Sequence, residues 1–355
     1  MSLSAIRGAL GLAVQSTKGT AVTADNLYTY LPTLNANAMG EQIAQPLPPE
    51  VGGTYFSRGS YKAALRARGE IQLIPRVGTL GFLLRSVFNG EAITANAATG
   101  IDGGGATVNR HLHRFTARVD LDPIWLSVRR YVASAWGEQL TDCRVGMFRL
   151  EIAASNVANA AVQLLGRDAV EIPGAEQMIG DDHVFLTANA TVQSEGVDFI
   201  VDKLTIEAGL QLTDNEFRIG AYGLDDITAL QRAVTVTADV RIKSRDLWSK
   251  VYRYGGAAPA AGTTGAWNPT IYRAGLNLRM LANEPVTGTA PAQYIDINMP
   301  ALDFLTIPVQ VAGAELVRAQ LQTMVTLGSD NWAGHADGVQ PITIDLMDSR
   351  ATVYA

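Results

Sequence analysis

The sequence predicts a mainly β protein. Three observations lead to this class: several segments alternate between apolar and polar residues, clusters of Gly, Asn and Asp separate them, and only two stretches have helical character. The clearest alternation covers residues 234–243, and residues 144–152, 201–212 and 292–299 alternate in the same way. A period of two places one set of side chains on a core and the other in water or against a neighbour. Each of these segments is therefore predicted to be a strand.

Two short helices interrupt the predicted strands. The first covers residues 77–88 and ends at Asn89-Gly90, a pair that favours a left-handed helix stop. The second covers residues 244–254 and ends at Gly255-Gly256, with Ser244 in the position of an N-cap. The chain has no uninterrupted apolar run long enough to span a bilayer, and its first residues do not resemble a signal peptide.

The order of elements around the two helices is the same. A predicted strand precedes each helix, at residues 65–73 and 234–242, and a Gly-rich loop follows each, at residues 98–107 and 257–265. The helix stops are 166 residues apart, close to half of the 355-residue chain. This recurrence predicts a tandem duplication, and chance recurrence within one enlarged domain is the alternative. The two expected domains are residues 1–177 and 178–355.

The stretch 31–57 has no clear periodicity and is rich in Pro, Gly, Asn and Gln. It is too long for an ordinary connection, so it is either disordered or a functional arm. We expect an arm that packs on a neighbouring copy rather than on the core of its own chain.

The composition favours self-association over nucleic-acid binding. Charged residues make up only 17% of the chain, below the roughly 25% usual for soluble domains. Such a surface suits burial against other copies, although ordinary variation in composition also accounts for it. The net charge of −6 argues against tight binding to a phosphate backbone.

No pattern in the sequence indicates a catalytic or cofactor-binding site. Motifs for a nucleophile elbow, a zinc protease, a Walker loop or a dinucleotide fold are absent, and Gly103-Gly104-Gly105 lacks the following Lys of a phosphate loop. The single cysteine, Cys143, begins an alternating run and is predicted to be a packed thiol. His111 and His113 would share one face of a strand, but a metal site needs a third ligand that is not evident.

The remaining polar and aromatic candidates do not form a site either. Acidic residues before a strand are typical of turns, and tryptophans without interleaved basic residues do not indicate base stacking. The residues considered are Asp181, Asp182, His183, Asp225 and Asp226, a possible acidic face of Asp198, Asp202, Asp214 and Glu216, and Trp125, Trp136, Trp248, Trp267 and Trp332. The sequence thus predicts no enzyme and no catalytic, cofactor-binding or metal-binding residue.

The order of several segments resembles the tail tube (major tail protein) family of siphophages, the long-tailed bacteriophages. Each segment alone is degenerate, and their order along almost the whole chain carries the resemblance. The similar segments are residues 8–20, 78–90, 123–128, 141–145, 148–150, 160–167, 295–300 and 306–313.

The resemblance implies a tail-tube-type β-sandwich or half-barrel with a short flanking helix. It further implies a structural virion protein, assembled in the host cytoplasm, whose rings stack into a tube and contact other tail proteins. DNA would pass through the lumen during ejection without specific binding, and no cofactor or membrane would be involved. Rings in this family are hexameric, so a duplicated chain would close a ring with three copies and pseudo-sixfold symmetry. An undivided chain would give a hexamer.

Three alternatives stay open at this point: a tube of the type VI secretion kind, another virion shell component such as a capsid or baseplate protein, and a β-rich hydrolase. The hydrolase would need paired carboxylates that face one cleft.

Overall fold

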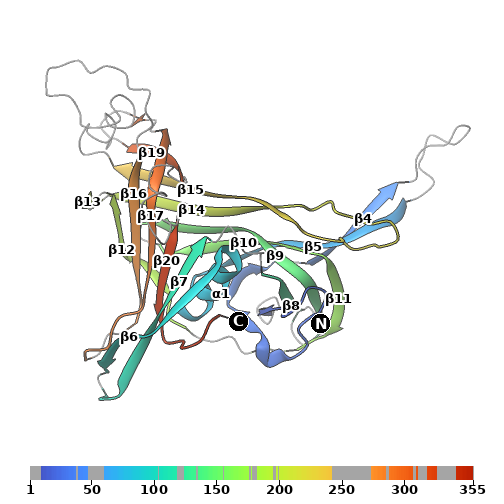
Figure 1. Ribbon diagram of the computed structural model, residues 1–355, viewed down its shortest axis with the longest axis horizontal. Coiled ribbons are helices and arrows are strands. Elements are labelled where there is room, and N and C mark those ends of the chain that lie inside the picture. The colour runs from blue at the N-terminus through green and yellow to red at the C-terminus, as the bar shows by residue number, and fades with distance from the viewer. Residues whose placement is uncertain are drawn as a thin grey trace, which may run out of the picture.

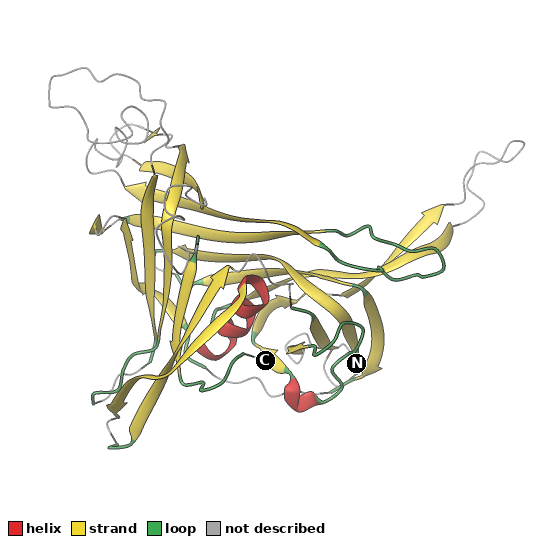
Figure 2. Ribbon diagram, in the orientation of Figure 1, coloured by secondary structure: helices red, strands yellow, loops and turns green. Residues whose placement is uncertain are grey.

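The structure is a computed structural model of the chain. It describes residues 9–36, 39–46, 60–102, 104–117, 124–132, 135–154, 156–175, 177, 182–194, 197–198, 200–241, 273–284, 288–306, 309–310, 318–325 and 341–354. Long antiparallel strands dominate, as Figures 1 and 2 show, which confirms the mainly β class. None of the described helices is long and apolar enough to cross a membrane.

The first half of the chain contributes one α-helix, one short 3-10 helix and eleven strands. They are β1 (Ala9–Val14), η2 (Asp25–Leu27), β2 (Thr29–Leu31), β3 (Thr33–Ala36), β4 (Met39–Pro46), β5 (Ser60–Leu73), α1 (Val77–Phe88), β6 (Asn89–Ile101), β7 (Thr107–Ala117), β8 (Leu126–Val132), β9 (Trp136–Ala153), β10 (Asn159–Gly166) and β11 (Asp168–Pro173).

The second half contributes the remaining described strands. They are β12 (Phe185–Ser194), β13 (Val197–Asp198), β14 (Val201–Leu212), β15 (Ala229–Arg241), β16 (Arg273–Ala282), β17 (Tyr294–Thr306), β18 (Val309–Gln310), β19 (Arg318–Val325) and β20 (Thr343–Asp348). The predicted strands 144–152 and 201–212 fall within β9 and β14. The predicted strands 234–243 and 292–299 overlap β15 and β17, which end at Arg241 and begin at Tyr294 respectively.

One long antiparallel sheet runs through both halves. Its order is β4–β5–β10–β9–β14–β15–β19–β17, and β3 continues β4 along β5. A second layer starts from β17, whose N-terminal part lies between β16 and β20; β20 then pairs with β7, and β7 with β6. The first residues of β9 bend away into a small sheet with β8 and β11, and β8 pairs there with β1.

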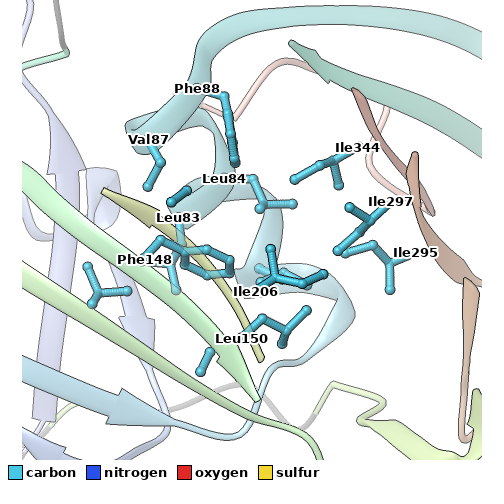
Figure 3. Packing of buried hydrophobic residues seen from close by; sticks show 14 of the residues in the cluster. Leu83, Leu84, Val87, Phe88, Phe148, Leu150, Ile206, Ile295, Ile297 and Ile344 are labelled. Atoms are coloured by element: carbon cyan, nitrogen blue, oxygen red, sulfur yellow. The ribbon is translucent and has the colours of Figure 1, made fainter. Parts of the chain in front are cut away.

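Helix α1 packs between the two layers, below the long sheet in Figure 1. The predicted helix stop is confirmed: Asn89 is the C-cap and has a left-handed φ of 61°. Figure 3 shows the apolar contact between the helix and both layers. The buried side chains are Leu83, Leu84, Val87 and Phe88 of α1, Phe148 and Leu150 of β9, Ile206 of β14, Ile295 and Ile297 of β17, and Ile344 of β20. Full burial of such a side chain contributes about 1.5–3 kcal/mol.

The strand pairings of the first half recur in the second half. Each pair in the first half has a counterpart in the second half: β1–β2 matches β12–β13, β1–β8 matches β12–β16, β8–β9 matches β16–β17, β9–β10 matches β17–β19, β9–β11 matches β17–β20, β5–β10 matches β15–β19 and β4–β5 matches β14–β15. All of these pairs are antiparallel. The hairpin β6–β7 has no counterpart in the part of the chain that the structure describes.

One sequence prediction about a loop is wrong. The Gly-rich stretch 98–107 is not a loop throughout, because Ala98–Ile101 pairs with Thr107–Arg110. Its small side chains fit a strand, and at Gly100 the missing Cβ lets the backbone of Thr289 approach. The predicted second helix, 244–254, and the loop 257–265 lie outside the described residues.

Part of the stretch 31–57, in which the sequence shows no clear periodicity, forms strands. Thr33–Ala36 and Met39–Pro46 both pair with β5 of the same chain, in a hairpin that extends from the body of the molecule (Figure 1). Backbone pairing needs no apolar alternation when neither face of a hairpin is deeply buried, and so the sequence carried no signal. Residues 47–57 lie outside the described part.

Candidate assembly surface

The face of the long sheet opposite α1 is predominantly polar. Because strand side chains alternate, each buried residue of the core face has polar neighbours on the other face. In one row Glu151 of β9 lies opposite Thr205 of β14, followed by Thr237 of β15 and Gln322 of β19. Gln72 of β5 and Gln163 of β10 extend the exposed polar positions to the first strands.

Charges in the middle of this face are paired across strands. Arg149 Nε of β9 donates to Glu207 Oε2 of β14 at 3.0 Å, and the two residues are direct register partners. Lys203 Nζ lies 2.9 Å from Glu151 Oε1. Exposed pairs of this kind contribute only about 0–1 kcal/mol to stability. Their larger effect is that each of these two cations is neutralised by a carboxylate on the neighbouring strand.

The long sheet is open at both ends. At one end β4 pairs with β5 and has no second strand partner among the described residues. At the other end Thr306 and the strand β18 pair with β19. On their other side they have no strand partner among the residues that the structure describes. The amide of Gly40 donates to Glu138 Oε1 at 3.0 Å, which fixes the start of β4 against β9. Open edges are templates for pairing with another chain.

The two histidines that the sequence singled out lie on β7 and are both buried. His113 is fully engaged: its Nδ1 lies 2.8 Å from Glu91 Oε1, and its Nε2 lies 2.8 Å from the carbonyl of Arg350 and 3.1 Å from Asp348 Oδ1. His111 Nδ1 accepts the amide of Asn96 at 3.2 Å. Within the described ranges, no group of three His, Cys, Asp or Glu is arranged to hold a metal ion.

The chain matches the sequence model of the family described as phage tail tube protein over residues 5–316. It belongs to the phage tail tube protein family. The match covers nearly the whole chain, so it applies to both halves of the long sheet and not to one part of it. A search of curated proteins found no match.

Family membership makes this tail tube protein a structural component of a phage tail that assembles with itself and with other tail proteins. The family is generally not enzymatic, in line with the sequence prediction.

Cys143 and two of the acidic residues that the sequence singled out are buried or paired with residues of their own chain. Cys143 is completely buried, as predicted, and burial raises the pKa of its thiol above the usual range, with Asp142 adding to the effect. Asp202 and Asp214 lie at opposite ends of β14 and pair with Arg241 and Arg66. The proposed acidic face therefore does not converge at one place.

Trp125 has basic neighbours that sequence spacing concealed. The guanidinium of Arg144 lies 3.7 Å from its ring centroid and the ammonium of Lys18 lies 5.3 Å away. Lys18 also pairs with Asp226 at 2.8 Å. These contacts bring the N-terminal segment, β9 and the loop before β15 together, so Trp125 of the tail tube protein joins distant segments of its own chain.

No pattern in the sequence indicated the buried polar cluster that Tyr354 of the tail tube protein forms with Asp348, Glu91 and His113. Tyr354 is fully buried, its hydroxyl donates to Asp348, and its amide donates to Glu91. Burial alone would lower the pKa of His113, but hydrogen bonds with Asp348 and Glu91 outweigh it and raise the pKa to about 9. A single glycine, Gly81 in α1, was the only available signal, because its missing side chain accommodates the Tyr354 ring.

Proposed function

We propose that this tail tube protein forms rings that stack into a tube, and that the tube encloses the channel through which the genome passes during DNA ejection. The observation that carries the proposal is the long amphipathic sheet with an open edge at each end. Joining such sheets edge to edge closes a barrel and removes the unpaired edges. Assembly takes place in the host cytoplasm, and the tube becomes part of the virion tail.

The polar face of the long sheet lines the channel in this proposal. Duplex DNA carries one negative charge per roughly 1.7 Å, and free basic side chains would bind it and release counterions. Arg149 and Lys203 are instead paired with Glu207 and Glu151. Amides, hydroxyls and paired charges suit a surface past which DNA slides without specific binding.

We further propose that each chain supplies two tube-like units, residues 1–177 and 178–355, and that three chains close a ring with pseudo-sixfold symmetry. The recurring order of strand pairings supports this division. Three copies of an eight-stranded sheet give roughly 24 strands, which at about 4.8 Å spacing and about 40° tilt make a barrel about 50 Å across. Six copies would make a barrel about twice as wide, so three copies enclose a DNA duplex more closely. A hexamer of undivided chains is the alternative.

Electron microscopy of the purified protein tests the proposal. Tubes or stacked rings are expected, and end-on views together with the mass of an isolated ring give the number of chains. A stable monomer at high concentration, across salt conditions, contradicts ring formation. Six chains per ring contradict the division into two units while leaving the tube intact.

A further inference from the structure

The long sheet contains an internal junction between its two halves. Residues 147–153 of β9 pair antiparallel with residues 203–209 of β14, so that Met147 lies opposite Gly209 and Leu150 opposite Ile206. This junction joins the four strands β4, β5, β10 and β9 to the four strands β14, β15, β19 and β17. In the correspondence between the halves, β17 matches β9 and β4 matches β14. The two strands that match the sides of the junction therefore lie at the open ends of the sheet.

A β-bulge fixes how the two halves correspond. The register between β10 and β9 shifts at Gln163/Leu164, where Gln163 faces Met147 and Leu164 faces Val145. The register between β19 and β17 shifts by the same one residue, since Gln322 faces Thr306 and Thr323 faces Phe304. Bulges are specific features of a strand pair and rarely move within a family. Alignment of the two bulges places Met147 in correspondence with Thr306.

Burial and the neighbouring pairings agree with this alignment. Ala160, Val162 and Leu164 are buried on β10, and the corresponding Ala319, Leu321 and Thr323 are buried on β19. The match ends after the bulge, where Leu165 is buried and the corresponding Met324 is exposed. The same alignment can be followed through the neighbouring strands. In the first half the path runs from β10 to its partner β5 and then to β4, and in the second half it runs from β19 to β15 and then to β14.

The second pair of strands gives the other side of the junction. Leu165 of β10 faces Arg68 of β5, and Arg68 faces Met39 of β4. The equivalent path from Met324 of β19 runs through Thr235 of β15 to Glu207 of β14. Met39 therefore corresponds to Glu207, and two residues further along Glu41 corresponds to Gly209.

We propose that the end of β17 of one copy pairs antiparallel with the start of β4 of the next copy, with Thr306 opposite Glu41. The inference rests on the proposed ring, and it names the contact that closes it. The contact repeats between copies the junction that β9 and β14 make within the chain, where Met147 faces Gly209. Both edges lack a second strand partner among the described residues, although the amide of Gly40 on β4 already donates to Glu138. Open strand edges are templates for pairing with another chain.

Engineered cysteines test the register. Residues directly opposite in an antiparallel pair have Cα atoms about 4.5–5.5 Å apart, within the range that a disulfide spans. The variant Glu41→Cys/Thr306→Cys should therefore form a disulfide between copies under mild oxidation of assembled rings. The matched control Ile43→Cys/Thr306→Cys is out of register by two residues, about 8 Å, and should cross-link about tenfold less. The buried native Cys143 is alkylated during denaturation before non-reducing electrophoresis.

The cross-linked ladder also counts the copies. With one junction per copy, a three-chain ring gives bands of one, two and three chains and none beyond. Rings that are normal in micrographs but give no Glu41–Thr306 cross-link, or that cross-link better in the control, overturn the inference and leave the proposed function standing. A wild-type protein that never assembles overturns both.

Hydrogen exchange on the unmodified protein provides a second measurement. On assembly the amides of Glu41–Ile43 and of Leu305 and Thr306 that face the open edges should become protected by at least about tenfold, as expected for newly paired strands. Exchange at these amides that is equal before and after ring formation overturns the inference without any substitution.

Discussion

The aromatic ring of Tyr354 lies in the space that a side chain at Gly81 would occupy. A Cβ at Gly81 would overlap the ring, and the tyrosine hydroxyl reaches Asp348 beyond it. Tyr354 thus packs on the middle of α1, although 273 positions separate it from Gly81 in the sequence. Its ring fills the core next to the helix, together with His113 and Phe115.

Gly81→Ala should destabilise the protein, although alanine is the better helix former by up to about 1 kcal/mol. The added methyl group would displace Tyr354, and overpacking of this kind lowers the free energy of unfolding by about 1–3 kcal/mol. Gly78→Ala in the same helix is the control, since its Cβ would meet only the side chain of the exposed Asp182. Urea unfolding of both variants provides the comparison, and equal effects would contradict the role given to Tyr354.

Tyr354→Ala should lower the free energy of unfolding by about 3–5 kcal/mol, because it empties a fully buried site. Tyr354→Phe keeps the ring and loses only the hydrogen bond to Asp348, so about 1–2 kcal/mol is expected. Chemical denaturation measures both. A Phe variant as unstable as the Ala variant would show that the hydroxyl, and not the packing on Gly81, dominates.

Stability should fall as the pH rises from about 6.5 to about 9. His113 is faced by Glu91 of β6, by Asp348 of β20 and by Tyr354 and Arg350 of the C-terminal segment, and Arg85 of α1 pairs with Glu91. Its pKa is raised from 6.5 to about 9, so the stabilising contribution is complete below pH 6.5 and is lost as the pH passes 9. The contribution is on the order of 3 kcal/mol.

Asp348→Asn provides the control for this pH dependence. It removes one of the two carboxylates that favour the imidazolium and so lowers the folded-state pKa of His113. The loss of stability should still begin near pH 6.5, but it should be smaller and complete at a lower pH than in the wild type. Unfolding measured at a series of pH values reports the shift. An unchanged profile in His113→Gln would contradict the assignment to His113.

Deletion of residues 45–53 should leave a folded subunit that no longer polymerises. The deletion removes Gln45 and Pro46, the last two residues of β4 in the hairpin that extends from the body of the molecule (Figure 1), and the seven residues that follow them in the sequence. Circular dichroism should remain close to that of the wild type, while sedimentation should show only small species. Polymerisation at the wild-type level would show that the end of the arm is dispensable.

Removal of the carboxylates on the polar face should make the tubes bind DNA. In Glu151→Gln/Glu207→Gln, Lys203 and Arg149 lose their partners, and each free cation that contacts a phosphate adds about 0.9 to the salt dependence of binding. Binding of labelled duplex DNA to assembled tubes at several salt concentrations is the measurement. Glu216→Gln, outside this face, is the matched control and should bind as weakly as the wild type.

The sequence by itself determined the features that depend on neighbours along the chain. Alternation over residues 201–212 gave the bounds of β14, and Asn89-Gly90 gave the end of α1, because side-chain direction and φ preference are local properties. The alternating context of Cys143 indicated its burial for the same reason. The order of segments was enough to indicate the family.

Only the tertiary structure decided which strands meet. Nothing local distinguishes β14 as the partner of β9, since pairing depends on backbone groups that every strand presents. The strands β3 and β4 escaped notice because their pairing with β5 does not require a buried face. Tyr354 and Gly81 are in contact although they are far apart in the sequence. The space that the tyrosine ring fills exists only after α1 and both sheet layers have packed together. Contacts between residues so far apart in the sequence form only when the whole core packs, so no short segment of the sequence can predict them.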